Sequence, residues 1–303
     1  MNGIVDGLSV VEDLCGVQMC MPPKVAVPKP GPCKGSKRGP ARSVVSKVVG
    51  NKPPTARPLG VAAARKRLEG IYGERLHITG SGKEINQHIK ELANVPAGMH
   101  DTVNRYFNNV HPNTGGIYIG VGPVTEISPG GKELQGVQPR GWTKGKTFAQ
   151  VAGVFIGKYG EVVIGSGLPS GSTSGSAHEL AHALDVASRT GAVPISVSKR
   201  QPWRDVMNTV YASPDLLLKP YYTPTVNPTG WLSEAFAESL AAWAKVHRRG
   251  ADEQVQAILG ALGANKPGRQ PSPAVTDAVK DMIAMFEYMA GSDGYERGAA
   301  LLH

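Results

Sequence analysis

One short segment, from Ser176 to Asp185, constrains the fold of this chain more than any other. It reads SAHELAHALD, so His178 and His182 would lie one turn apart on the same face of an α-helix. Uncharged helix formers fill most of the other positions. A helix with this composition belongs inside a domain, and its polar face then needs a partner.

The predicted partner is a metal ion. Two imidazoles one turn apart can direct nitrogen lone pairs at a single tetrahedral Zn²⁺ ion. Glu179 stands between them, where its carboxylate can take a proton from a metal-bound water. Asp185 lies one turn beyond His182. It is either a residue that holds an imidazole in place or a solvent-facing residue at the helix end.

A third ligand is expected on a second helix. The segment from Trp231 to Trp243 reads WLSEAFAESLAAW, which is largely apolar but carries Glu234 and Glu238 four residues apart on one stripe. A metal ion would account for two acidic residues on an otherwise apolar helix: Glu234 would be the ligand, and Glu238 would hold an imidazole in place. The alternative is two exposed glutamates that share a wet helix face with Lys245.

The two motifs together resemble a known family. HELAHALD at residues 178–185, followed by EAFAE at residues 234–238, is similar to the gluzincin catalytic domain of anthrax lethal factor and its smaller relatives, the Pro-Pro endopeptidases. The resemblance spans about residues 70–290, but only these two motifs are specific. It implies a zincin-like α+β metallopeptidase, with a small mixed sheet, an active-site helix and a helical C-terminal half. The implied activity is zinc-dependent endopeptidase activity.

The chain departs from the family at one position. The family carries a tyrosine seven residues before the ligand glutamate, where it stabilises the tetrahedral oxyanion, and Asn227 stands there in this sequence. Tyr221 and Tyr222 lie further upstream, where a longer loop would deliver one of them to the site, and of the two we expect Tyr222 to take the oxyanion role. If Asn227 is instead matched to the family's asparagine, Gly230 falls at the ligand position. Glu234 is preferred because a metal needs a carboxylate.

Charge divides the chain into regions. The whole chain has a net charge of +9. Residues 14–68 contribute twelve Lys and Arg and no acid, and the first thirteen residues contribute three acids. These two segments account for the whole net charge, so residues 69–303 are neutral. Residues 1–20 fit a docking peptide or a frayed terminus. Residues 21–61 predict a disordered, basic, proline-rich linker, and the metallopeptidase domain is expected over residues 62–303.

The basic linker has two interpretations. It is a solvated tether, or it binds an acidic partner. Nucleic acid is not expected, because the linker has no interleaved aromatic residues on which bases could stack.

Local patterns predict the other elements. A hairpin is expected just before the metal-binding helix, and its edge strand would line the cleft and pair with an extended substrate. A serine at 174 or 176 would cap that helix, and residues 128–146 are expected to be a loop. Further helices are predicted over residues 62–72, 83–93, 100–109, 203–212, 254–262 and 273–289, and strands over 76–78, 116–121, 151–156 and 161–164.

The remaining sequence features concern context. No apolar run is long enough to predict a membrane span, and no secretory signal is recognisable at the N-terminus. Cys15, Cys20 and Cys33 predict no disulfide framework for the core. We expect an effector or toxin exported by a dedicated system, or a phage-carried protease, with a protein or peptide substrate. The alternative function is a non-catalytic interaction module with a basic tether and a structural or inert metal site.

Overall fold

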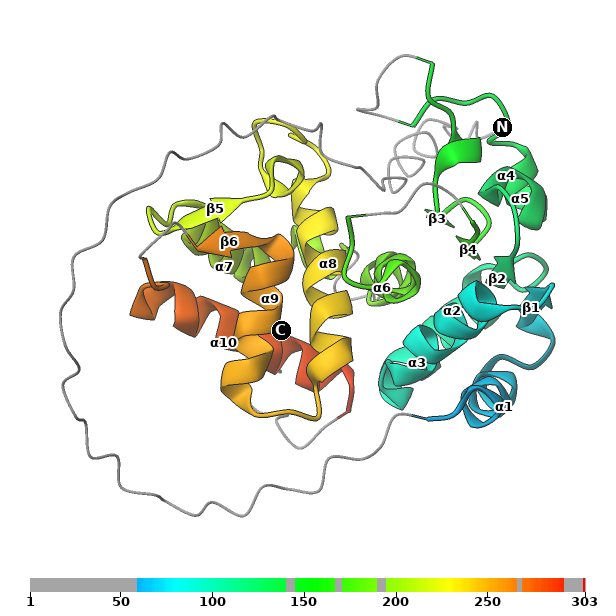
Figure 1. The fold of residues 1–303 in the computed structure, drawn as a ribbon, viewed down its shortest axis with the longest axis horizontal. Helices are drawn as coiled ribbons and strands as arrows, with labels where there is room; N and C mark the ends of the chain where they lie inside the picture. Colours follow the sequence, from blue (N-terminus) through cyan, green and yellow to red (C-terminus); the bar gives the residue numbers. More distant parts are fainter. Residues whose placement is uncertain are drawn as a thin grey trace, which may run out of the picture.

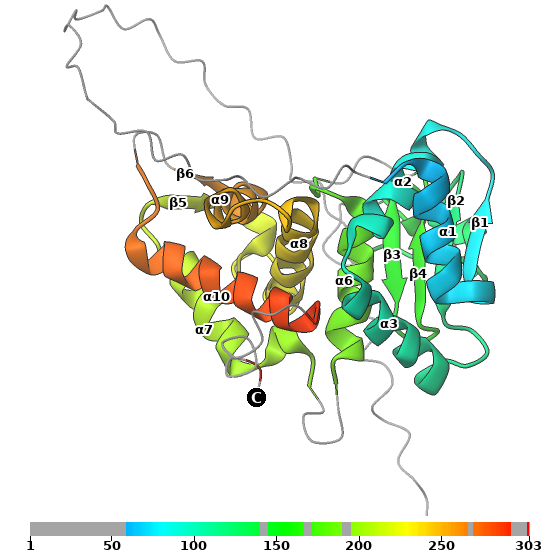
Figure 2. The ribbon, with the colours of Figure 1, turned by 90° about the horizontal axis from the view of Figure 1, so that it is seen from below.

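A computed structural model describes residues 59–139, 145–166, 171–189, 195–265, 269–291 and 302. The fold is α+β, with a small mixed sheet, as expected. Two lobes lie on either side of helix α6 (Gly175–Ala187), one built around the sheet and the other mostly helical (Figures 1 and 2). The predictions for residues 1–58 fall outside the described part of the chain.

The sheet has strands β1 (Leu76–Thr79), β2 (Gly116–Gly120), β3 (Gly153–Ile156) and β4 (Glu161–Ile164). They pair in the order β1-β2-β4-β3. The pairs β1–β2 and β2–β4 are parallel, whereas β3 runs antiparallel to β4 through the predicted hairpin. As a result, β3 lies at one edge of the sheet.

Both faces of β3 and β4 are covered, so every residue of these two strands is buried, whereas β1 is exposed at alternate residues. Phe155, Val162 and Ile164 pack in one core with α6 and the helices α1 (Val61–Tyr72), α2 (Lys83–Asn94) and α3 (Ala97–Val110). Alternate residues such as Val154 and Val163 form a second core on the opposite face. That face is covered by α4 (Val124–Ile127), α5 (Pro129–Lys132) and the 3-10 helix η3 (Phe148–Gln150).

The expectation of a loop over residues 128–146 is wrong for α5. The Ser128 hydroxyl accepts a hydrogen bond from the amide of Gly131 and caps this short helix. The buried carboxylate of Glu161, on β4, accepts hydrogen bonds from the Ser128 hydroxyl and the Gly130 amide. The group that stabilises α5 is therefore about thirty residues away, beyond the reach of a local pattern.

The second lobe is built around buried aromatic rings. Trp203 lies 5.2 Å from Phe236 between ring centroids, and Phe286 lies 5.7 Å from Phe236 and 5.6 Å from Trp243. The pair β5–β6 was not anticipated from the sequence. The elements of this lobe are η4 (Val197–Lys199), α7 (Gln201–Tyr211), β5 (Leu216–Leu218), η5 (Pro220–Tyr222), α8 (Trp231–Val246), α9 (Ala251–Leu262), β6 (Gly263–Asn265) and α10 (Pro273–Met289).

The predicted helices and strands are all present, with ends that differ by three residues or fewer. Among the helices that the structure describes, none is both long and apolar enough to cross a membrane.

His100 is buried in the helical layer of the first lobe. Its Nδ1 lies 2.7 Å from the Tyr72 hydroxyl and its Nε2 lies 3.0 Å from the carbonyl oxygen of Leu92. Burial lowers the pKa of His100 to about 4. Below pH ~6.5 the unfolded chain therefore binds a proton that the folded chain does not, and this histidine makes stability fall as the pH drops towards 4.

We expect His100→Gln to remove this part of the pH dependence. Between pH 7 and 4 the wild-type protein should lose roughly 3 kcal/mol more stability than the variant. The reason is that the variant has no imidazole whose pKa differs between the folded and the unfolded chain. Urea unfolding in the presence of a chelator measures the effect. The exposed His77, changed to Gln, is the control and should alter the slope less. Parallel curves for wild type and His100→Gln would contradict the assignment.

Candidate metal centre

Helix α6 carries the two histidines through the middle of the molecule. The Ser174 hydroxyl, one of the two predicted caps, accepts a hydrogen bond from the amide of Ala177 and starts the helix. One side of α6 packs on β3 and β4, and the other packs on α8. His178 and His182 are each 2% exposed, so the helix is buried as its composition predicted.

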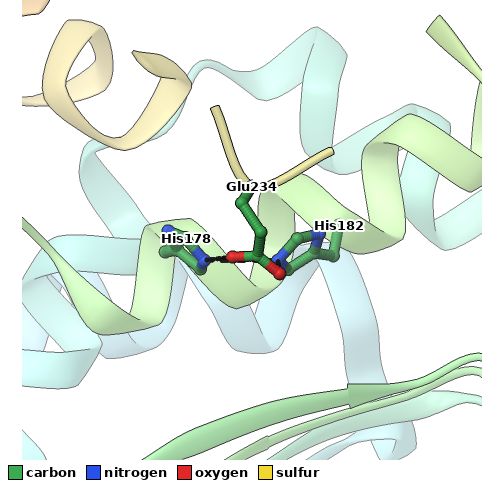
Figure 3. Close-up of side chains that lie close together, drawn as sticks. All are labelled: His178, His182 and Glu234. Carbon is green, nitrogen blue, oxygen red and sulfur yellow. Dashed lines mark hydrogen bonds and ion pairs between the residues drawn. The ribbon is translucent and has the colours of Figure 1, made fainter. Parts of the chain in front are cut away.

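Helix α8 brings two glutamates to these histidines. Glu234 is 2% exposed and Glu238 is fully buried. The alternative of a wet face shared with Lys245 is therefore wrong, since only Lys245 is exposed. Gly230 caps the N-terminus of α8. The alternative alignment would make Gly230 the ligand, but glycine has no donor side chain. Glu234 instead points between the two imidazoles (Figure 3).

The three side chains converge on one point. The Nε2 atom of His178 lies 3.2 Å from Nε2 of His182 and 3.2 Å from Oε2 of Glu234. The Nε2 atom of His182 lies 3.6 Å from Oε1 of Glu234. Ligands at ~2.0–2.1 Å from a tetrahedral ion would be separated by ~3.3 Å. These three residues can therefore hold a metal ion.

Glu238 holds the imidazole of His178 from the opposite side. One oxygen, Oε2, lies 3.2 Å from Nδ1 of His178. The other accepts hydrogen bonds from the amide and the hydroxyl of Thr173, at 2.8 and 2.9 Å. Such a carboxylate fixes both the tautomer and the orientation of the ring. Glu238 therefore lies where it can orient the imidazole of His178.

The structure gives Asp185 other partners than the expected imidazole. Its oxygens accept hydrogen bonds from the amide and the hydroxyl of Ser198, at 2.8 and 2.6 Å, and tie α6 to η4. The Nδ1 atom of His182 instead faces the Ser233 hydroxyl at 3.3 Å. Neither Ser233 nor Thr173 was identified from the sequence, because serine and threonine are common and no spacing marks these two.

The buried carboxylate of Glu179 lies beside the ligand group. No described residue makes a close hydrogen bond to either of its oxygens, although the side chain is fully buried, and the Phe155 backbone is the least of the groups that lower its pKa. Burial raises the pKa of Glu179 to about 7, against the opposing charges of His178 and His182. An unpartnered carboxylate at this depth is costly. A nearby cation with its water would supply the missing interactions, so the surroundings of Glu179 fit a metal centre.

The histidines and glutamates of the ligand group are paired with one another even without an ion. Burial opposes charging of His178, but its hydrogen bonds to Glu234 and Glu238 outweigh burial and raise its pKa to about 10. Burial similarly opposes ionisation of Glu234, but the neighbouring His182 and His178 outweigh it and lower the Glu234 pKa. A metal ion would compete with the proton on His178, so its binding should release a proton.

Tyr222, the expected oxyanion donor, ends the short helix η5, which packs against α8. It is 5% exposed and its ring lies 5.7 Å from that of Tyr221 in an edge-to-face arrangement. Asn227, at the position of the family's tyrosine, is buried and accepts a hydrogen bond from the Gly230 amide. Asn227 therefore helps to start α8.

Comparisons with known proteins add no assignment. No protein-family model and no curated protein matches this chain.

We expect the protein to bind one equivalent of Zn²⁺. Glu234→Ala should weaken binding more than Glu238→Gln, for which loss of the orienting contact predicts a decrease of about 10- to 100-fold. Competition with a metal-sensitive chelating dye measures the affinities. Glu133→Gln is the control, because Glu133 is exposed and bonded to Lys158. Equal affinities of the wild type and Glu234→Ala would rule out this metal centre.

Proposed function

We propose that this chain is a zincin-like, zinc-dependent endopeptidase of the gluzincin type. The observation that carries the proposal is the convergence of His178, His182 and Glu234. The buried, unpartnered carboxylate of Glu179 follows His178 directly in the chain. A purely structural metal site would have no use for this additional carboxylate.

The donor set favours zinc. Two imidazoles and one carboxylate suit Zn²⁺, whereas Mg²⁺ and Ca²⁺ prefer sites built from oxygen atoms. Three protein ligands leave one coordination position for water or substrate, as in catalytic rather than structural zinc sites. Bound in this position, Zn²⁺ would acidify a water molecule and polarise a peptide carbonyl.

Glu179 then acts as the proton carrier. Its carboxylate accepts the proton of the attacking water and passes it to the leaving amine. Burial raises the pKa of Glu179 to about 7 in the metal-free chain, and a bound Zn²⁺ would lower it and so favour the carboxylate that accepts the proton. Glu238 keeps the ring of His178 in its ligand orientation, and Ser233 does the same for His182.

The sheet edge supports a peptide substrate. Among the described strands, β3 pairs only with β4, and it packs on α6. An extended peptide could add to its open edge by main-chain hydrogen bonds and so reach the ligand group. The assignment of the oxyanion to Tyr222 rests on the family resemblance, and it belongs to the proposal with the rest of the mechanism.

We expect Glu179→Gln to abolish cleavage of a peptide library without loss of zinc. General acid–base catalysis contributes about 10²- to 10⁴-fold, so kcat should fall within that range. Mass spectrometry of the products gives the rates and the cleavage sites, and metal analysis gives the zinc content. Unchanged turnover in the variant would reject the role of Glu179. A wild-type protein that holds zinc but cleaves nothing would favour the non-catalytic interaction module.

Gly153 offers a second test, because its backbone lies against the proton carrier. A methyl group at this position would lie 2.8 Å from Cγ and 3.2 Å from Oε1 of Glu179. We expect Gly153→Ala to displace this carboxylate and lower kcat by up to about 100-fold, with zinc retained. Gly260→Ala is the matched control, since nothing lies within 4 Å of a methyl group there. Equal kcat values for the two variants would show that Gly153 does not position Glu179.

A further inference from the structure

A cavity of about 400 Å³ opens between α2, the start of α6 and the second half of α8. Figure 1 shows α2 and α8 flanking the end of α6. The cavity combines two kinds of lining. Small apolar side chains come from Ala93, Ala177, Ala241 and Ala244, and positive charges come from Lys90, Lys245, Arg248 and Arg249.

The positive charges are mostly uncompensated. Arg249 lies 3.4 Å from Glu253. Lys90, Lys245 and Arg248 form no ion pair with any carboxylate in the part of the chain that the structure describes. The one acid in the lining, Glu91, accepts hydrogen bonds from Gln87 and Ser174, both at 2.8 Å.

A further cation lies close to this group. Burial and the charge of Arg248 both lower the pKa of Arg67, on α1. Several like charges around an apolar floor favour a ligand that is both acidic and aliphatic.

One part of the chain outside the described residues has this composition. Residues 1–13 read MNGIVDGLSVVED, with Asp6, Glu12 and Asp13 among aliphatic side chains. Residues 14–58 contain nine Lys and Arg and no acid, so they would be repelled by the cavity. Leu59 itself lines the cavity, and the chain therefore enters the folded part at its rim.

The intervening chain is long enough for the first residues to return. If residues 14–58 behave as the linker that their sequence predicts, a chain of this length spans roughly 35–40 Å on average. Such a tether holds a segment at an effective concentration of about millimolar, at which weak contacts suffice for docking.

We propose that this cavity binds residues 1–13 of the same chain. Their carboxylates pair with Lys90, Lys245 and Arg248, and their aliphatic side chains cover the alanine floor. Thr173, which holds Glu238 through two hydrogen bonds, also lines the cavity. The docked segment would therefore contact the residue that holds Glu238, the carboxylate beside His178, although the docking does not depend on the proposed peptidase activity.

Zero-length carbodiimide cross-linking of the full chain tests the proposal, because this reagent joins carboxylates to lysine amines in direct contact. We expect amide links from Asp6, Glu12 or Asp13 to Lys90 or Lys245, identified by peptide mass spectrometry. Their yield should fall as salt is raised from about 0.05 to 0.5 M, since ions screen exposed charge pairs. An added peptide of residues 1–13 should compete for the same lysines.

Two charge reversals sharpen the experiment. Arg248→Glu should reduce the links to Lys90 and Lys245 several-fold, whereas Lys132→Glu, on the opposite face of the sheet, should leave them unchanged. Circular dichroism would verify that both variants fold. Links spread evenly over exposed lysines, or found only within the basic linker, would overturn the proposal. Links between isotopically distinct chains in a mixed sample would also overturn it, in favour of a second copy as the occupant.

Discussion

The arrangement of the molecule depends on five ionisable side chains buried where α6 meets α8. His178, Glu179, His182, Glu234 and Glu238 are all 2% exposed or less. Burying charges is costly unless each one is paired, and here the histidines of α6 face the glutamates of α8, whereas Glu179 is left without such a partner. The pairing of His178 with two glutamates therefore fixes the register of α6 against α8, and through it the relation of the two lobes.

Short-range contacts around this group keep it in place. Thr173, which precedes α6 in the chain, donates hydrogen bonds to Glu238. Ser198, which follows α6, donates to Asp185, and Ser233 of α8 faces His182. On the fourth side, the bare backbone of Gly153 leaves room for Glu179. The same geometry thus serves the packing of two helices and the placement of a ligand group, so the candidate site and the core between the lobes are one structure.

Much of this arrangement could be predicted from sequence because periodicity is a local property. Helix α6 and the β3–β4 hairpin were predicted, Ser174 was one of the two predicted caps of α6, and the bounds of α10 agree with the prediction. The apolar residues around Glu234 and Glu238 left their burial open, and the buried position of both carboxylates decides between the two alternatives. The order of the strands, α5 and the pair β5–β6 depend on contacts between distant segments. The partners of Asp185 and His182 could not be inferred either, since hydroxyl groups on loops carry no distinguishing pattern.

The origin of the donors from two separate helices has a consequence for the newly made protein. In the chain, Glu234 follows His178 by 56 residues, which corresponds to roughly 3 to 11 s of elongation on the ribosome. During that interval the nascent polypeptide contains His178 and His182 but not yet Glu234, the third candidate ligand. The three candidate ligands can therefore come together only after α8 has been translated and has formed its helix, which sets the earliest moment at which a metal ion could meet all three.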